Sequence, residues 1–173
     1  MATVSRSRRS ASGIALIVAG ALLLLAVLLP LLGVAIPYLA VLAYAALAVA
    51  LGILALGAVN NTIAKVALIV SAIGFAILAI AGLGIAFPGV LITIASVVAA
   101  LGFLVGAIVL YVGKEITNTA ALAFVAAAVL AVVSLLGVIG TFALGAFGTI
   151  VTVLLGIALV VAGIFFRRPE NRR

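Results

Sequence analysis

Side chains that could carry acid, base, metal or nucleophilic chemistry are nearly absent from this chain. It contains no Cys and no His, and its only acidic residues are Glu115 and Glu170. Each glutamate stands beside a basic residue, Lys114 or Arg168, in a polar segment, where a solvated charge that balances its neighbour is expected. Because thiolates, imidazoles and paired carboxylates are missing, the sequence predicts a non-enzymatic protein with no catalytic residue, no metal site and no cofactor.

Hydroxyl groups are the remaining candidates for a site. Five of them stand inside long apolar runs, several residues after the run begins: Tyr44, Thr93, Ser96, Thr149 and Thr152. If these runs are helices that enter the membrane from one side, the five hydroxyls share a depth, and the pairs spaced three apart share a helix face. They are therefore candidates to line a common cavity. The alternative is that they bond to carbonyls of their own helix or join neighbouring helices.

The elements that carry these hydroxyls must be membrane helices. Hydrophobic residues make up 70% of the chain and charged residues 6%, whereas about a quarter of the residues in a soluble domain are charged. The apolar runs show no alternation of apolar and polar residues, which excludes barrel strands. Residues 66–112 carry no charge, and at about 1.5 Å per residue they are long enough to cross a hydrocarbon core of about 30 Å twice. Pro88 and Gly89 near the middle predict the turn of this hairpin.

The same unit recurs on either side of residues 66–112. We expect an all-α integral membrane fold of six transmembrane helices, arranged as three tandem hairpins of like orientation. The hairpin repeats are predicted at 13–59, 60–112 and 113–166, between basic tails at 1–12 and 167–173. Their turns are expected near 30–37, 86–89 and 140–148, where Pro or clustered Gly disfavours helix.

Basic residues predict the orientation of these spans. Every Lys and Arg falls in the two tails or in the two loops near 60–65 and 113–118, whereas the three opposite turns hold none. This positive-inside pattern places both termini in the cytoplasm. We expect the protein in the cytoplasmic membrane. The residues that set the topology are Arg6, Arg8, Arg9, Lys65, Lys114, Arg167 and Arg168.

Partners follow from the same charges. The net charge of +7 is compatible with nucleic-acid binding, but the basic residues flank apolar spans, where they meet anionic lipid headgroups. No aromatic and basic residues interleave as they do on nucleic-acid surfaces. We therefore expect the bilayer as the principal partner and no nucleic acid. A second copy of the chain or another membrane protein is a further candidate partner.

Short segments repeat within the chain. LGVAIP at 32–37 recurs as LGIAFP at 83–88, and pairs of Leu-Gly stand at similar intervals in all three units. Each unit holds two spans, so the units enter the membrane in the same direction, unlike inverted transporter repeats. Small residues in these spans let helix backbones approach closely in lipid. The predicted helix-packing positions are Gly52, Gly102, Gly106 and Gly156.

This pattern of Gly, a long apolar run, Pro and a second run with internal Gly resembles the HdeD-like family of short-repeat bacterial membrane proteins. It runs from Gly13 through Pro30 to Gly52, again through Pro88 to Gly106, and in part from Gly137 to Gly163. The resemblance implies a six-span inner-membrane protein linked to acid or general stress, without a defined biochemical activity.

Two other functions fit the sequence. A membrane subunit of a small-solute transporter has a similar size and span number and would associate with ATPase partners. A passive channel built from the bundle or from an oligomer is the third hypothesis. Proton- and ion-coupled carriers are disfavoured, because they usually need ionisable groups inside the membrane and the predicted spans contain none besides Tyr.

Overall fold

The computed structural model describes residues 2–57, 59–114, 118–138 and 145–167, and the regular elements in these ranges are all α-helices. Six helices follow one another: α1 (Ala2–Leu31), α2 (Leu39–Gly57), α3 (Thr62–Gly82), α4 (Gly89–Val112), α5 (Asn118–Val138) and α6 (Gly145–Arg167). The prediction of an all-helical fold is confirmed for the described residues, which contain no strand.

Most of these helices are long and apolar enough to cross a membrane. By length and composition, five of them qualify: α1 from Ser10 onward, α2, α3, α4 and α6 from Gly148 onward. In α5 the apolar stretch Thr119–Leu135 is shorter than this criterion requires. The helix itself has 21 residues and extends over about 31 Å, which matches a hydrocarbon core of about 30 Å.

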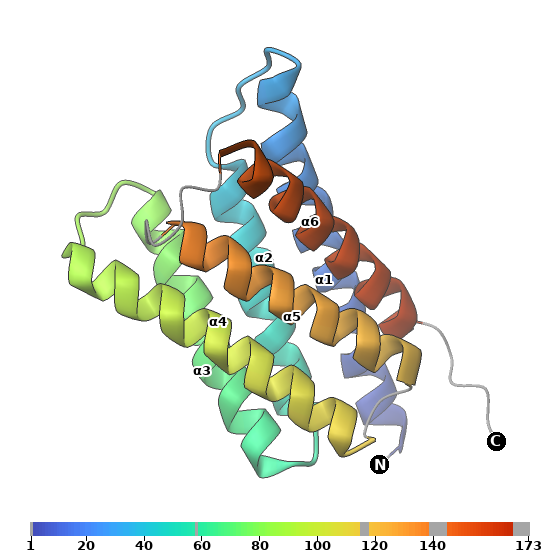
Figure 1. Cartoon of the computed structure of the whole chain (residues 1–173). Helices are drawn as coiled ribbons and strands as arrows, with labels where there is room; N and C mark the ends of the chain where they lie inside the picture. Colours follow the sequence, from blue (N-terminus) through green and yellow to red (C-terminus); the bar gives the residue numbers. More distant parts are fainter. Residues whose placement is uncertain (1, 58, 115–117, 139–144, 168–173) are drawn as a thin grey trace.

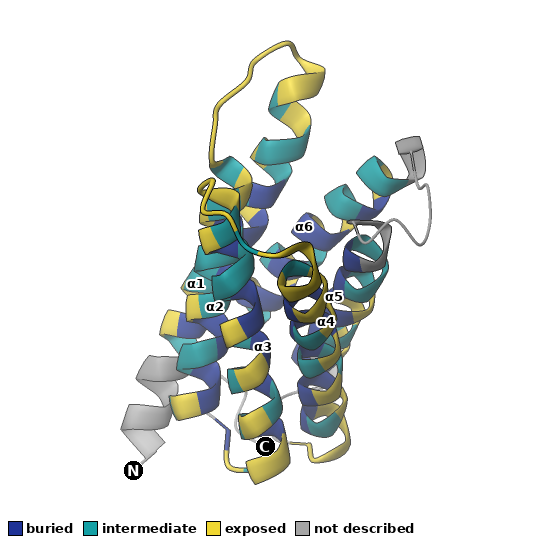
Figure 2. Cartoon of the chain, turned by 90° about the vertical axis from the view of Figure 1, so that its left-hand side faces the viewer, coloured by how far each residue is buried: buried dark blue, intermediate teal, exposed yellow. Residues whose placement is uncertain are grey.

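The helices form a closed ring of two layers. Figure 2 shows α1, α2 and α3 in one layer and α4, α5 and α6 in the other, with buried residues between them. Each helix packs against the next one in the chain, and α6 packs against α1 (Figure 1). Within the described residues no other pair of helices makes close backbone contact. Sequence neighbours are therefore spatial neighbours, and the contact between α1 and α6 closes the ring.

Two of the turns have the same local geometry. Gly33 follows α1 with φ +80° and Gly84 follows α3 with φ +89°, values that glycine adopts without steric cost. After α1, the N–H of Val34 donates to the carbonyl of Leu29 and that of Gly33 to the carbonyl of Pro30, which is a Schellman end. Both glycines belong to the repeated segments LGVAIP and LGIAFP, so these segments end a helix.

The third unit differs at this point. α5 continues through Gly137 to Val138, so Gly137 does not end its helix as Gly33 does. α6 begins at Gly145, inside the break expected at 140–148. Residues 139–144 lie outside the described part of the chain.

From Ala2 onward, the predicted basic tail at 1–12 has a helical backbone that is continuous with the first apolar run. α1 begins at Ala2, so residues 2–12 are helical, and Ser12 is fully buried. Its hydroxyl donates to the carbonyl of Ala50 in α2 over 2.9 Å. A helix that continues past the apolar run pairs the backbone groups at the start of that run within the helix.

Aromatic side chains fill much of the space between the layers. Tyr44, Phe75, Phe103, Phe124 and Phe166 come from α2, α3, α4, α5 and α6 in turn, with ring centroids 6.0, 6.4, 4.9 and 5.5 Å apart. The last three contacts are edge-to-face, a favoured geometry for aromatic pairs. Because Tyr44 lies near the start of α2 and Phe166 near the end of α6, this aromatic chain runs diagonally through the bundle.

Candidate functional site

The seam between α1 and α6 is built from glycines that face each other. A Cβ atom at Gly163 would lie 2.5 Å from the carbonyl oxygen of Gly13, and one at Gly20 would lie 2.6 Å from that of Gly156. Gly13 and Gly20 are seven residues apart on α1, so they lie on one face of that helix. Gly156 and Gly163 have the same spacing on α6. The two helices are antiparallel, and their backbones touch where side chains would otherwise separate them.

A second seam joins α3 and α4. A Cβ atom at Gly102 would lie 2.7 Å from the carbonyl oxygen of Ala67, and one at Gly106 would lie 2.6 Å from a methyl carbon of Leu68. Gly74 of α3 faces Ala95 and Ala99 in the same way. The hydroxyl of Ser71 crosses this seam and donates to the carbonyl of Ala99 over 2.6 Å.

The four predicted packing glycines differ in their surroundings. Gly102, Gly106 and Gly156 lie at these two seams, whereas nothing lies within 4 Å of a Cβ atom built on Gly52. Gly52 instead borders an open apolar groove between α2 and α3. Sequence reasoning missed Gly13, Gly20, Gly74 and Gly163. The seven-residue spacing of the glycines in α1 and in α6 is a signal that could have identified their seam.

The predicted hydroxyl set is not gathered in one place. Thr93 is exposed and donates to the carbonyl of Gly89 over 3.0 Å. Ser96 is buried and donates to the carbonyl of Ile92 over 2.9 Å. Both bonds run to the preceding turn of the same helix, as serine and threonine commonly do. Neither residue lines the cavity described next, and neither does Thr149.

Tyr44 and Thr152 do lie together, at a cavity between the two layers. The cavity has a volume of about 210 Å³ and is partly enclosed by residues of α1, α2, α3, α5 and α6. Ser134 of α5 contributes a third hydroxyl-bearing side chain. Sequence reasoning did not include Ser134, because it considered hydroxyls that follow the start of a run. Ser134 lies four residues before the end of α5, which places it at the same depth on a helix of opposite direction.

Small side chains create this space. Five alanines line the cavity where larger residues would fill it: Ala19, Ala26, Ala40, Ala43 and Ala131. Apart from the three hydroxyl-bearing residues and Phe75, the other lining side chains are aliphatic, and the Phe75 ring stacks on Tyr44 at an interplanar angle of 22°. Leu47 and Leu159 line the cavity as well. The aromatic chain thus begins at the cavity and continues away from it.

The three hydroxyls differ in how they are bonded. Thr152 donates its proton to the carbonyl of Gly148 over 2.9 Å and keeps an oxygen that can accept. For Tyr44 and Ser134, no hydrogen bond is found among the described residues. A mostly buried hydroxyl without a partner costs free energy, so these two groups are available to a molecule in the cavity.

Charged side chains lie away from the cavity. Lys65 at the start of α3, Lys114 after α4 and Arg167 at the end of α6 are at the opposite end of the bundle, and none of them is among the cavity residues. The backbone of Arg6, Arg8 and Arg9 is helical, but their side chains, like Glu115, Arg168 and Glu170, are outside the described part. In that part no group of three His, Cys, Asp or Glu residues could hold a metal ion.

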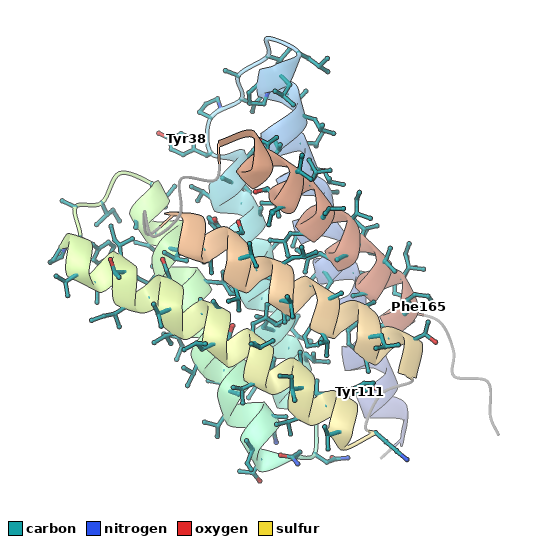
Figure 3. All side chains as sticks on the ribbon, in the orientation of Figure 1. Tyr38, Tyr111 and Phe165 are labelled. Atoms are coloured by element: carbon teal, nitrogen blue, oxygen red, sulfur yellow. The ribbon has the colours of Figure 1, made fainter. Side chains whose placement is uncertain are left out.

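Aromatic residues at least partly open to the surroundings lie near both ends of the bundle. Figure 3 places Tyr38 near one end, and Tyr111 and Phe165 near the other. Tyr38 is 56% exposed and Tyr111 is 43% exposed. Amphipathic aromatic rings are typical of the two membrane interfaces, and this arrangement fits helices that traverse a bilayer.

Fold and cavity together define an apolar helical bundle with five helices able to span a membrane. Comparison of the chain with protein-family models, with curated proteins and with solved structures finds no match.

Proposed function

We propose that this chain is a non-enzymatic protein of the bacterial inner membrane that crosses the bilayer six times, with both termini in the cytoplasm. Its role is structural or stress-associated, and it does not conduct solutes through its own interior. The link to acid or general stress rests on the resemblance of the hairpin pattern to HdeD-like proteins.

The observation that carries the proposal is the chemistry of the interior. Lys65, Lys114 and Arg167 lie at one end of the bundle, and the buried polar side chains of the described part are Ser12, Ser71 and Ser96. Their hydroxyls all donate to backbone carbonyls. Such groups neither bind nor release protons near neutral pH, which argues against proton- or ion-coupled transport.

Packing of the aromatic chain argues against a passive channel formed by one copy. Phe75, Phe103 and Phe124 are at most 1% exposed, and each ring contacts the next. They occupy the middle of the bundle between the cavity and the end that bears the charges. A continuous water path would require these rings to separate, and apolar constrictions exclude water.

Flux measurements test this proposal. The purified protein is reconstituted into liposomes, and the entry of glycerol and of protons is followed beside protein-free liposomes. We expect identical rates, because the interior is packed. Faster entry of either solute, abolished when the protein is heat-denatured before reconstitution, would contradict the proposal and favour the channel hypothesis.

The cavity favours a second candidate function, the membrane subunit of a small-solute transporter. A solute-binding subunit needs a binding cavity that opens away from its cytoplasmic partners, and this cavity lies at the end opposite the charged residues. Purification from native membranes in mild detergent distinguishes the two functions. Recovery of a stoichiometric ATPase subunit supports the transporter, whereas recovery of the chain without one supports the first proposal.

A further inference from the structure

The cavity near Tyr44 has the properties of a binding site for a small molecule. We infer that it binds an uncharged, mostly apolar compound about the size of a substituted benzene ring, which carries a carbonyl or ether oxygen that accepts a hydrogen bond from Tyr44. The inference rests on the proposed function in one respect. It uses the proposed orientation of the chain, which places the cavity in the half of the membrane remote from the cytoplasm.

Size is the first argument. The volume is about 210 Å³, and an apolar cavity of about 150 Å³ accommodates benzene. A ring with a short substituent therefore fits, whereas a phospholipid headgroup with its chains does not. The alanines of α1, α2 and α5 leave this volume open, and Tyr44, Phe75 and Leu159 bound it.

Charge is the second argument. No carboxylate, ammonium, guanidinium or imidazole group is among the cavity residues, which contribute aliphatic groups, two aromatic rings and three hydroxyls. A carboxylate or ammonium group would lose its hydration without gaining an ionic partner, and such transfer is strongly unfavourable. The site therefore selects neutral molecules.

Hydrogen bonding is the third argument. The hydroxyl of Tyr44 has no partner among the described residues, and stacking on Phe75 at 6.0 Å fixes the plane of its ring. Because the ring is already held in place, its O–H can bind a ligand oxygen with little further loss of side-chain conformational freedom. Thr152 already donates to Gly148, so Tyr44 is the better donor for a ligand oxygen.

Two fluorinated probes of similar shape test the inference. The ketone 4-fluoroacetophenone offers an acceptor, and 1-fluoro-4-isopropylbenzene lacks it. Each probe is titrated into the full chain in nanodiscs and followed by ¹⁹F NMR, with protein-free nanodiscs as the baseline for partition into lipid. We expect saturable binding of both probes to the wild-type protein.

The variant Tyr44→Phe removes one oxygen and keeps the ring. We expect it to weaken binding of the ketone by about threefold to tenfold, the value of one hydrogen bond. Binding of 1-fluoro-4-isopropylbenzene, which has no acceptor oxygen, should not change. The control Tyr111→Phe changes an exposed tyrosine outside the cavity and should bind both probes as the wild type does.

A cavity-filling variant tests the location. Ala131→Leu places three further carbons in the cavity and should weaken both probes, whereas Ala126→Leu on the exposed face of the same helix should weaken neither. If Ala131→Leu does not fold, the comparison of Tyr44→Phe with Tyr111→Phe decides alone.

The inference is overturned if the folded wild-type protein shows no saturable binding, if Tyr44→Phe weakens both probes equally, or if Tyr111→Phe has the same effect as Tyr44→Phe. These outcomes are independent of the flux test. A chain that conducts glycerol can still bind the ketone through Tyr44, and a chain without flux can fail to bind it.

Discussion

The methyl group of a single alanine cannot be accommodated at several glycines of this protein. At Gly163 it would lie 2.5 Å from a backbone oxygen of α1, and backbone cannot move aside as the end of a side chain can. α1 and α6 would have to separate. Because these two helices close the ring, their separation affects the whole bundle.

Exchanging Gly163 for alanine should therefore destabilise the protein. We expect Gly163→Ala to lower the free energy of unfolding by about 1–3 kcal/mol, the usual cost of overpacking. The measurement is an unfolding titration with SDS in mixed micelles, followed by circular dichroism. Gly52→Ala is the matched control, because its Cβ would meet no atom within 4 Å; since Ala is the better helix former, it should leave the unfolding free energy unchanged or raise it by up to about 1 kcal/mol. Equal effects of the two substitutions would contradict the assigned seam.

The hydroxyl of Ser71 joins two helices, whereas that of Thr93 bonds within one. Ser71→Ala removes the bond to Ala99 across the seam between α3 and α4, and interhelical hydrogen bonds in membranes contribute about 0.6 kcal/mol on average and at most about 1.7. We expect a loss of stability within this range in the same titration. Thr93→Val removes only a bond to its own helix and should have a smaller effect. A larger effect of Thr93→Val would argue against the interhelical role of Ser71.

At the scale of elements, the turn after α3 depends on one glycine. Gly84 has φ +89°, and an L-residue in the left-handed region costs about 1–2 kcal/mol. Gly84→Ala should lower the unfolding free energy by about this amount. Gly89→Ala is a suitable control, because Gly89 has no positive φ and its Cβ would meet no atom within 4 Å. If both variants unfold at the same SDS concentration, the turn does not depend on this backbone conformation.

Helix ends could be predicted from the sequence, but packed helix faces could be predicted only where glycines mark them, as at Gly102, Gly106 and Gly156. Gly33, Gly84 and Pro88 interrupt apolar runs, and the helices end or begin at these residues. In water, the buried face of a helix is identified by its apolar stripe. In this chain the outward-facing residues are also apolar, with exposed Ile14, Val49 and Leu101 as examples, so no such stripe distinguishes the packed face.

The candidate site was predictable only in part for a related reason. Depth along a helix follows from counting residues, which predicts a shared depth for five hydroxyls, and two of these, Tyr44 and Thr152, line the cavity. Which way each hydroxyl turns depends on the rotation of its helix, which packing of small residues determines. Thr93 and Ser96 bond to their own helix, and Ser134 enters the cavity from a helix of opposite direction.

At the scale of the whole molecule, the closed ring constrains how the chain crosses the membrane. The antiparallel seam places the start of α1 beside the end of α6, since Gly13 faces Gly163 and Arg167. α5 lies between α4 and α6, with Phe124 in contact with Phe103 and Phe166. Its residues Ala131, Ser134 and Leu135 reach the cavity near the opposite end. With 21 residues, α5 therefore extends alongside its neighbours for most of their length.

Cysteine labelling tests whether α5 crosses the bilayer with the others. The chain has no cysteine, so Lys114→Cys, Arg167→Cys and Leu83→Cys each introduce a single exposed thiol. In intact bacterial cells, we expect a membrane-impermeant maleimide to label the thiol at position 83 and to reach those at 114 and 167 only after the cells are opened. If α5 did not cross, positions 114 and 167 would lie on opposite sides of the membrane, and only one of them would be protected in intact cells. That result would leave five spans and contradict an arrangement in which both termini face the cytoplasm, because the basic segments would then be divided between the two sides.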